Sequence, residues 1–257
     1  MGICKDKRCL SISQKKDSII PQNLIYYAGG TDITGIVFTG GEGPDPQALK
    51  SLLDSLKTRV LTVAADSGLS LAETAGLRPD WIIGDMDSLD SEDRLLKYPA
   101  DRVVHCAADK DHTDTELALS LLWEKGCDDT WIMGGGGGRL DHLFGIRDLL
   151  ERKRFPCRWI TAAEDIRCIE AGNTADDAAN YGSLTKAVEP GTLVSVFPLG
   201  TEPWKAGSRG LKWPLDNVPW ARGMFGLSNV AVEEEITVSA RQGRFMLIFP
   251  YPSGGLF

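Results

Sequence analysis

The sequence predicts an α/β domain with a parallel β-sheet, followed by an antiparallel β domain. From Gly35 to about Arg152, short apolar runs alternate with longer segments of helical periodicity. This alternation is typical of βαβ units. Beyond about residue 180, strand signals follow one another between Gly- and Pro-rich turns with no helical segment between them. Such a pattern favours antiparallel pairing in a small sandwich.

The elements can be placed in order along the chain. In the first part, strands are expected at 36–38, 60–65, 81–83, 103–106 and 131–133, and helices at 47–56, 69–75, from about 91, at 113–125 and at 140–152. These strands are short, continuous and apolar, as parallel strands buried on both faces are. Further strands are expected at 159–161, 166–169, 193–197, 236–240 and 245–249. The expected architecture is a Rossmann-like α/β/α domain with a parallel sheet, followed by an antiparallel β-sandwich.

Composition excludes several classes of protein. The 257 residues carry a net charge of −8, so no basic surplus exists to neutralise nucleic acid or an anionic membrane. The six cysteines form no CxxC pair, and with only three histidines they indicate neither a zinc site nor a disulfide framework. No apolar run approaches the ~20 residues that span a bilayer, and residues 1–16 lack the apolar stretch of a signal peptide. We therefore expect a soluble, cytoplasmic protein.

The residues most suggestive of chemistry lie between Pro79 and Glu116. Asp85 and Asp87 directly follow the strand at 81–83, and Asp109, Asp111 and Asp114 follow the next strand. Carboxylates past the ends of neighbouring parallel strands converge in the crevice where open α/β sheets bind ligands. Two charges about 4 Å apart repel by roughly 4 kcal/mol at an effective dielectric near 20. A cation would relieve this repulsion, and hard oxygen donors favour Mg²⁺ held together with substrate phosphates.

A structural role for the same residues is the alternative. Asp, Ser and Thr after strands often cap the next helix, and two capping starts stand here: Ser91 with Glu92 or Asp93, and Thr113 with Glu116. Capping needs one oxygen per helix, whereas this window supplies far more. The whole set therefore favours a metal site, although any single Asp fits a cap.

A glycine run follows the strand at 131–133 and precedes a helix. Gly134 to Gly138 allow backbone N–H groups to approach a phosphate, and the helix dipole also favours negative charge there. The run matches neither the Walker pattern nor a clean dinucleotide fingerprint, and a simple flexible turn would look the same. Arg139 suits phosphate oxygens, and Asp141 would orient Arg139 or a metal-bound water. Asp66, after the strand at 60–65, either contacts the nucleotide, orders the acidic residues or caps the next helix.

Together these motifs resemble the thiamine pyrophosphokinase (thiamin diphosphokinase) family. The resemblance covers about Gly35 to Tyr251 and rests on the order and spacing of the motifs AADSG, RPDWIIGDMDS, DKDHTDTELAL, GGGGGRLDH, GLKWPLDN and GLSN. It implies a kinase-type transferase in which the hydroxyl of thiamine attacks the β-phosphorus of ATP, giving thiamine diphosphate and AMP. It also implies a homodimer whose sites lie between the α/β domain of one subunit and the β domain of the other.

The resemblance assigns roles residue by residue. Asp85, Asp87 and Asp114 match the acidic residues that hold Mg²⁺. Thr113, Arg139 and Asp141 match positions around the nucleotide and phosphates of ATP, the co-substrate. The residue patterns described above add Asp66, Lys110, Gly137 and Gly138 to the expected contacts with ATP. Those to thiamine are Trp213, Ser228 and Asn229. Arg139 and Asp141 join the three metal-binding Asp residues as expected catalytic residues.

Three positions depart from the family pattern. Many members have a second Gly and an Asn where this chain has Ser67 and Ser70, which puts the nucleotide contacts near Asp66 in question. Many also have Phe where this chain has Met86, a spacer that need not touch metal. On the same basis, residues 34–172 are the expected ATP-binding catalytic domain, and 173–257 the domain for thiamine binding and dimerisation. Residues 1–33 form an N-terminal arm to which no function is assigned.

The expected mechanism is positioning plus charge stabilisation by metal and cationic side chains. Lys110 and Arg139 would balance phosphate charge, and one carboxylate near the metal, not identified by sequence, would take the proton of the hydroxyl. Three alternatives stay open: a metal-dependent phosphohydrolase with a nucleophilic Asp, a pyrophosphokinase acting on another alcohol such as a pterin, and a nucleotide-sensing module without turnover.

Overall fold

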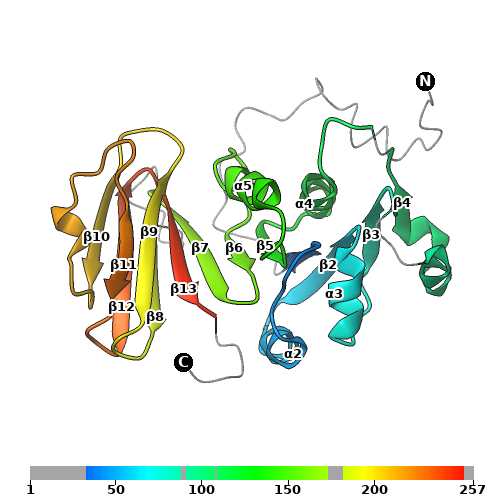
Figure 1. Cartoon of the computed structure of the whole chain (residues 1–257), viewed down its shortest axis with the longest axis horizontal. Helices are drawn as coiled ribbons and strands as arrows, with labels where there is room; N and C mark the ends of the chain where they lie inside the picture. The colour runs from blue at the N-terminus through cyan, green and yellow to red at the C-terminus, as the bar shows by residue number, and fades with distance from the viewer. Residues whose placement is uncertain (1–32, 88–90, 108, 173–181, 252–257) are drawn as a thin grey trace. The chain divides into compact units, whose positions relative to one another are not determined.

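The computed structural model describes residues 33–87, 91–107, 109–172 and 182–251. The chain divides into two compact units (Figure 1). Unit 1 ends at Leu143, and unit 2 runs from Phe144 to Pro252. This division lies earlier in the chain than the predicted functional boundary at residue 172, and the assignment of functions to the two predicted domains stays a prediction.

Unit 1 contains the predicted parallel sheet. Its strands are β1 (Ile33–Phe38), β2 (Arg59–Ala65), β3 (Trp81–Gly84), β4 (Val103–His105) and β5 (Asp129–Met133). They lie in the order β5-β1-β2-β3-β4, and the pairs β5–β1, β1–β2, β2–β3 and β3–β4 are all parallel. Their apolar runs are buried because helices cover both faces: Ile36 to Phe38, Ile82, Ile83 and Ile132 are fully buried. The predicted fold class of this part is confirmed.

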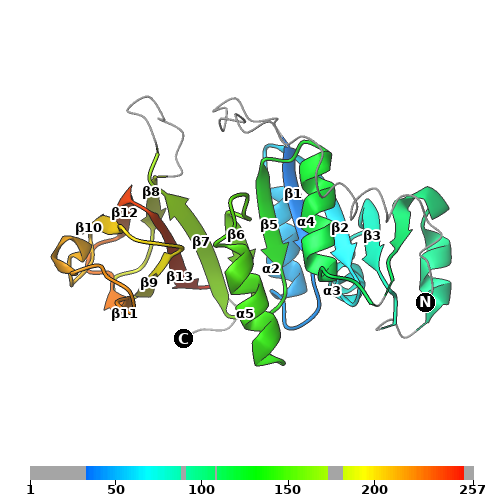
Figure 2. The ribbon, with the colours of Figure 1, turned by 90° about the horizontal axis from the view of Figure 1, so that it is seen from above.

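The helices of unit 1 are α2 (Pro46–Asp54), α3 (Gly68–Thr74) and α4 (Asp114–Glu124). Figures 1 and 2 show α2 and α3 on one face of the sheet and α4 on the other. Right-handed crossovers require this arrangement, because the chain moves from β1 towards β4 and then returns to β5 on the far side of β1. The strand order therefore reverses between β1 and β5, which is where open α/β sheets bind ligands.

The helix predicted from about Ser91 is wrong in type. The chain instead forms two short 3-10 helices, η1 (Glu92–Lys97) and η2 (Ala100–Arg102), separated by Tyr98 and Pro99. Pro99 explains the interruption, because the residue before a proline is driven out of the helical region, and Tyr98 is extended. None of the helices in the described part of the chain is long and apolar enough to cross a membrane.

Unit 2 is the predicted antiparallel β-sandwich. The helix α5 (Leu140–Leu149) crosses the division between the units. The strands that follow are β6 (Arg158–Ile160), β7 (Glu164–Glu170), β8 (Ser183–Ala187), β9 (Leu193–Leu199), β10 (Lys205–Arg209), β11 (Gly226–Val230), β12 (Glu235–Gln242) and β13 (Arg244–Pro250), with a 3-10 turn η3 (Leu215–Asn217). Within this unit, β11-β9-β13-β7-β6 form one run of strands and β10-β12-β8 form a second sheet.

Side chains from both layers of unit 2 meet in one core. Val194 and Phe245 from the first layer and Ile236 and Val238 from the second belong to the same cluster of buried residues. Shared burial of inner faces is what holds two sheets together in a sandwich. Every described pairing within this unit is antiparallel, as expected for a sandwich.

Candidate active site

Three carboxylates converge where β2 and β3 end. Asp66 directly follows β2, and Asp85 and Asp87 follow β3. Ala65 pairs with Ile83 in the parallel register, so the residues beyond the two strands leave the sheet side by side. One carboxylate oxygen from each of the three lies within 4.8 Å of the others. These residues are called the acidic group below.

The backbone in and next to the acidic group adopts uncommon conformations. Asp66 has φ of 49° and Met86 has φ of 65°, which is the left-handed region that few residues other than Gly adopt. Such conformations cost on the order of 1–3 kcal/mol each and persist only where the surroundings impose them. Gly84 also has φ of 157°, and a Cβ there would lie 3.2 Å from the Cα of Asp66. The backbone conformation and the close approach of the two strand ends therefore both favour glycine at this position.

The acidic group fits a divalent cation. Its donors are hard carboxylate oxygens, which Mg²⁺ and Ca²⁺ prefer. Oδ1 of Asp66 is buried, and no residue in the described ranges supplies a hydrogen bond to it. An ionised oxygen that is removed from water and given no donor is costly unless a cation balances it. The arrangement thus supports the predicted metal role of Asp85 and Asp87 and adds Asp66, for which sequence left the role open.

Asp114 lies beside the acidic group and is paired with a lysine. Oδ1 of Asp114 is 2.8 Å from Nζ of Lys110, which lies four residues earlier in the segment before α4. Burial raises the pKa of Asp114, and the charges of Asp85 and Asp66 raise it further, against the opposing effect of Lys110. Burial alone would lower the pKa of Lys110, but the hydrogen bond and charge of Asp114 outweigh it and leave that pKa raised. The predicted metal contact of Asp114 stays a prediction.

Thr113 is the N-cap of α4. Its hydroxyl accepts a hydrogen bond from the backbone N–H of Glu116, and its own backbone N–H donates to the Glu116 carboxylate at 2.8 Å. This reciprocal arrangement is a capping box, so the structural alternative considered for this pair is confirmed. Ser91 is the N-cap of η1, because its hydroxyl accepts a hydrogen bond from the N–H of Asp93. A contact of Thr113 with ATP stays a prediction.

The glycine run after β5 is held against a second loop after β1. The N–H of Gly135 donates to the carbonyl of Gly40 at 2.8 Å, and Gly136 and Glu42 exchange two backbone hydrogen bonds of 2.6 and 3.0 Å. The run is therefore anchored, and not the flexible turn that its composition also allowed. Sequence reasoning missed the partner loop, although Gly40-Gly41 directly after a strand was a signal for it.

Gly137 and Gly138 follow the anchored pairs, with φ of 62° and 64°. A Cβ on Gly137 would lie 2.6 Å from Cδ of Glu42. Both positions thus favour glycine, Gly137 for space as well as conformation. They lead into the N-terminus of α5, a place where backbone N–H groups suit phosphate.

Arg139 and Asp141 form a two-point ion pair at the start of α5. Nε and Nη2 of Arg139 donate to the two carboxylate oxygens of Asp141 at 3.1 and 2.6 Å. The hydrogen bond from Arg139 lowers the pKa of Asp141. Both side chains are exposed, so the guanidinium is oriented while its other donors face solvent. The hypothesis that Asp141 orients Arg139 agrees with this geometry.

The residues expected near thiamine lie together in unit 2. Trp213 has 53% of its surface exposed. Asn229 is buried, and its side-chain amide makes two hydrogen bonds to the backbone of Trp213. Oδ1 accepts from the Trp213 N–H at 3.1 Å, and Nδ2 donates to the Trp213 carbonyl at 2.6 Å. Ser228 has φ of 54°, and its N–H donates to Oγ of Ser195. Asn229 thus holds the Trp213 backbone at a fixed place.

The departures at Ser67 and Ser70 have different surroundings. A Cβ on Gly40 would lie 2.2 Å from Oγ of Ser67, so the loop after β1 passes directly over this side chain. Oγ of Ser70 instead accepts a hydrogen bond of 3.1 Å from Nη1 of Arg94. Ser70 therefore fastens α3 to η1.

Comparison with known protein families gives two matches along the chain. Residues 52–160 match the family description "Thiamin pyrophosphokinase, catalytic domain", and residues 183–245 match "Thiamin pyrophosphokinase, vitamin B1 binding domain". The first range contains the acidic group and the glycine run, and the second contains Trp213 and Asn229.

Individual proteins give the same result. The chain is 28% identical to a thiamine pyrophosphokinase of Bacillus subtilis over 190 residues, which are 73% of this chain and 86% of that protein. It is 25% identical to thiamine pyrophosphokinase 1 of Oryza sativa, and there the match spans 63% of each protein. The chain thus spans less than two thirds of the plant relative.

Solved structures are also similar. The crystal structure of the thiamine pyrophosphokinase from Bacillus subtilis superposes with a TM-score of 0.67 at 25% identity, covering 86% of this chain and 99% of that one. The thiamin pyrophosphokinase from Geobacillus thermodenitrificans gives a TM-score of 0.65 at 28% identity, covering 87% and 100%.

Proposed function

The chain belongs to the thiamin pyrophosphokinase family, and we propose that it transfers the pyrophosphoryl group of ATP to the hydroxyl of thiamine. The products are thiamine diphosphate and AMP. The observation that carries this proposal is the convergence of Asp66, Asp85 and Asp87, whose carboxylate oxygens lie within 4.8 Å of one another. They lie at the carboxyl ends of the parallel strands, and the anchored glycine run also follows the carboxyl end of such a strand. Carboxylates for a metal and backbone amides for phosphate are what the handling of ATP requires.

The residues proposed to hold Mg²⁺ are Asp66, Asp85 and Asp87, with Asp114 beside them. When bound, the ion would neutralise charge on the phosphate oxygens of ATP. Lys110 and Arg139 would supply the rest of the positive charge around the phosphates. Lys110 is fixed by Asp114 at 2.8 Å, and Arg139 is fixed by Asp141. Each cation is thereby oriented before substrate arrives, so little reorganisation is needed during the reaction.

The reaction forms one bond and breaks one bond at the β-phosphorus. The thiamine oxygen bonds to that phosphorus, and the bond from the phosphorus to the oxygen bridging to the α-phosphate breaks, so AMP leaves. The hydroxyl proton passes to one carboxylate near the metal. Because the chemistry at phosphorus needs no covalent help from the protein, this chain contributes mainly position and charge.

Trp213 is the proposed platform for thiamine. Nζ of Lys212 lies 4.7 Å from the centroid of the Trp213 ring, so one face of the indole already carries a cation. A second cation, such as the thiazolium of thiamine, would be repelled on that face. Thiamine is therefore proposed to stack on the other face of the indole. The aminopyrimidine is neutral, so stacking through this ring has a lower electrostatic cost than stacking through the thiazolium.

Dimerisation and location complete the proposal. Exposed apolar side chains gather on the edge strand β11, its neighbour β9 and the adjoining segments, namely Leu193, Phe225, Leu227 and Val232. Exposed apolar patches often mark contacts between subunits. We propose a homodimer through unit 2, with each site built from the two subunits, working in the cytoplasm.

Product identity tests the proposed reaction. Purified protein incubated with MgATP and thiamine should give AMP and thiamine diphosphate in equal amounts, measured by chromatography. A phosphohydrolase would release inorganic phosphate without needing thiamine. A pterin-specific enzyme would give AMP only when a pterin alcohol replaces thiamine. A nucleotide-sensing module would bind ATP without forming any product, and any of these three results would contradict the proposal.

A further inference from the structure

Met86, between the two carboxylates that follow β3, is buried. It is 3% exposed, whereas Asp87 beside it is exposed. Its φ of 65° turns the chain sharply at this point. Met86 belongs to one cluster of buried residues with Ala64, Leu69, Ile82, Tyr98 and Val103. The loop that carries Asp85 and Asp87 is thus fastened to the core by the side chain between them.

The same cluster includes Tyr98, which is tied to α3 by polar contacts. The Tyr98 hydroxyl donates to Oε1 of Glu73 at 3.2 Å, and Oε2 of Glu73 accepts from Nε and Nη2 of Arg94 at 3.1 and 2.6 Å. Burial raises the pKa of Tyr98 to about 12, together with the charge of Glu73. Tyr98 therefore stays protonated and donating across the physiological pH range.

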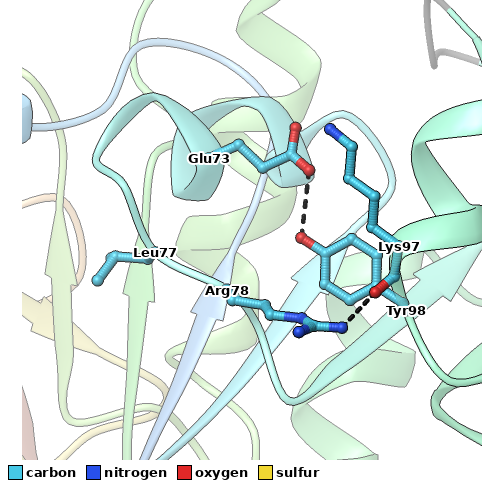
Figure 3. A pocket seen from close by; sticks show the side chains of 5 residues that line it. All are labelled: Glu73, Leu77, Arg78, Lys97 and Tyr98. Atoms are coloured by element: carbon cyan, nitrogen blue, oxygen red, sulfur yellow. Dashed lines mark hydrogen bonds between the residues drawn. The ribbon is translucent and has the colours of Figure 1, made fainter.

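A surface hollow opens on the outer side of these contacts. Figure 3 shows it lined by Glu73, Leu77, Arg78, Lys97 and Tyr98. Arg78 donates to the carbonyl of Lys97 and lies over the Tyr98 ring, 5.3 Å from its centroid. The Arg78 side chain thus contacts both residues of this segment and stabilises its position.

These contacts join the two chain segments that flank the acidic group. Asp66 precedes α3, and α3 carries Ser70 and Glu73. Asp87 precedes η1, and η1 and its cap carry Arg94 and Tyr98. The bonds of Arg94 to both Ser70 and Glu73 therefore hold α3, the helix after Asp66, against η1, the helix after Asp87.

We propose that Met86 and Glu73 are positioning residues for the acidic group, a role that rests on the proposed metal-dependent function. Neither side chain belongs to the set proposed to hold the metal. Met86 anchors the turn that aims Asp85 and Asp87 at Asp66, and Glu73 holds the two flanking segments together. Outer contacts of this kind orient metal ligands, and their loss typically weakens metal binding about 10- to 100-fold.

Mn²⁺ binding measured without nucleotide, by the EPR signal of the free ion, tests this role independently of turnover. Met86→Ala and Glu73→Gln are each expected to weaken Mn²⁺ binding about tenfold or more. Met86→Leu keeps a buried apolar side chain of similar volume, so this variant should bind Mn²⁺ nearly as tightly as the original protein. Leu49→Ala is the matched control, because Leu49 is fully buried on α2 and does not belong to the cluster that contains Met86 and Tyr98. It should lower the unfolding midpoint and leave Mn²⁺ binding unchanged.

Met86→Gly separates the anchor from the backbone conformation. Glycine adopts φ of 65° without strain but has no side chain to bury, so weak binding like that of Met86→Ala is expected. Binding by Met86→Gly or Met86→Ala equal to that of the original protein would overturn the inference. The proposed metal site has its own test in the same titration: it fails if Asp85→Asn binds Mn²⁺ as tightly as the original protein.

Discussion

At the scale of single residues, the acidic group combines features that lower stability and that the proposed metal binding would offset. Three carboxylates whose oxygens lie within 4.8 Å repel one another by roughly 4 kcal/mol for each close pair at an effective dielectric near 20. Asp66 after β2 and Met86 after β3 also adopt left-handed backbone. Unfavourable local features that the surroundings hold in place are common at functional sites.

We expect Asp66→Asn, Asp85→Asn and Asp87→Asn each to lower kcat/KM by on the order of 100-fold or more. This corresponds to about 3 kcal/mol of lost transition-state stabilisation, as for removal of one preorganised electrostatic contact. Because the three side chains would share one ion, the losses should be strongly non-additive. The triple variant should be barely slower than the slowest single variant in steady-state assays.

Stability measurements provide the control for these variants. In EDTA, each should unfold at the same urea concentration as the original protein or a higher one, because one repelling charge is removed. Asp54→Asn, at the exposed end of α2, should leave kcat/KM unchanged. Full activity in two of the three single variants would refute the metal assignment.

Replacing Trp213 should affect thiamine and spare ATP. Stacking of one base-like ring on an aromatic side chain is worth roughly 1–3 kcal/mol, so Trp213→Ala should raise the KM for thiamine about tenfold or more. Trp213→Phe should lose less, and the KM for ATP should change little in either variant. Trp213 would not be a thiamine-specific contact if the KM for ATP rose equally in a protein whose melting temperature is unchanged.

The sequence predicted individual site residues unevenly, for a physical reason. Asp85 and Asp87 are local neighbours, so one strand end places both of them. Asp66 joins them only through the pairing of β2 with β3, and the lysine partner of Asp114 depends on the path of the chain before α4. Local order along the chain therefore singled out all of these carboxylates as candidates, while the grouping of Asp66 with Asp85 and Asp87 needed the tertiary structure.

At the scale of elements, a buried charge cluster ties the strands of unit 2 together. Asp165 on β7 accepts from Nε of Arg158 on β6 and from Nε of Arg167, both at 2.8 Å, and Lys186 on β8 lies 3.4 Å away. Burial alone would raise the pKa of Asp165, but the hydrogen bonds and charges of Arg158 and Arg167 outweigh it and lower that pKa to about 2. The cluster links strands from both layers of the sandwich.

The lowered pKa gives this cluster a definite pH dependence. The stabilisation is present above the unfolded pKa of about 3.9 and is lost as pH falls through the folded value. The difference between the folded and unfolded pKa values corresponds to about 2–3 kcal/mol. Asp165→Asn should lower the free energy of unfolding at pH 7 by about 3–5 kcal/mol, because Arg158 is left buried without its counter-charge.

Urea unfolding between pH 2 and 7 measures both effects. The original protein should lose stability steeply below pH 4, and Asp165→Asn should show a shallower loss over that interval. Glu189→Gln, at an exposed position, serves as the control and should follow the original curve. Parallel curves for Asp165→Asn and the original protein would contradict the assignment.

Elements with strong apolar runs were predicted well, and elements without them were missed. The parallel strands of unit 1 are buried on both faces, so their sequences are continuous apolar runs. The strands β8, β10 and β11 have the sequences SLTKA, KAGSR and GLSNV and form strands through pairing with β12 or β9. Tertiary context overrides weak strand propensity at such positions.

At the scale of the whole molecule, the proposed shared site predicts complementation between inactive variants. Asp85→Asn leaves unit 2 intact, and Trp213→Ala leaves unit 1 intact. If each site uses unit 1 of one subunit and unit 2 of the other, a hybrid dimer contains one intact site. After random exchange, equal mixing should restore about a quarter of the original activity, since half of the dimers are hybrids with one site of two. No recovery after verified subunit exchange would show that each chain forms a complete site.

The transfer of a γ-phosphorus label tests the proposed reaction most directly. With ATP carrying ³²P at the γ-position, pyrophosphoryl transfer moves the label into thiamine diphosphate in a single step while unlabelled AMP appears in equal amount. Asp87→Asn, run in parallel, should form neither product at a comparable rate. We predict label in thiamine diphosphate with no ADP formed. Label in inorganic phosphate, or ADP accumulating as the product, would contradict pyrophosphoryl transfer by this protein.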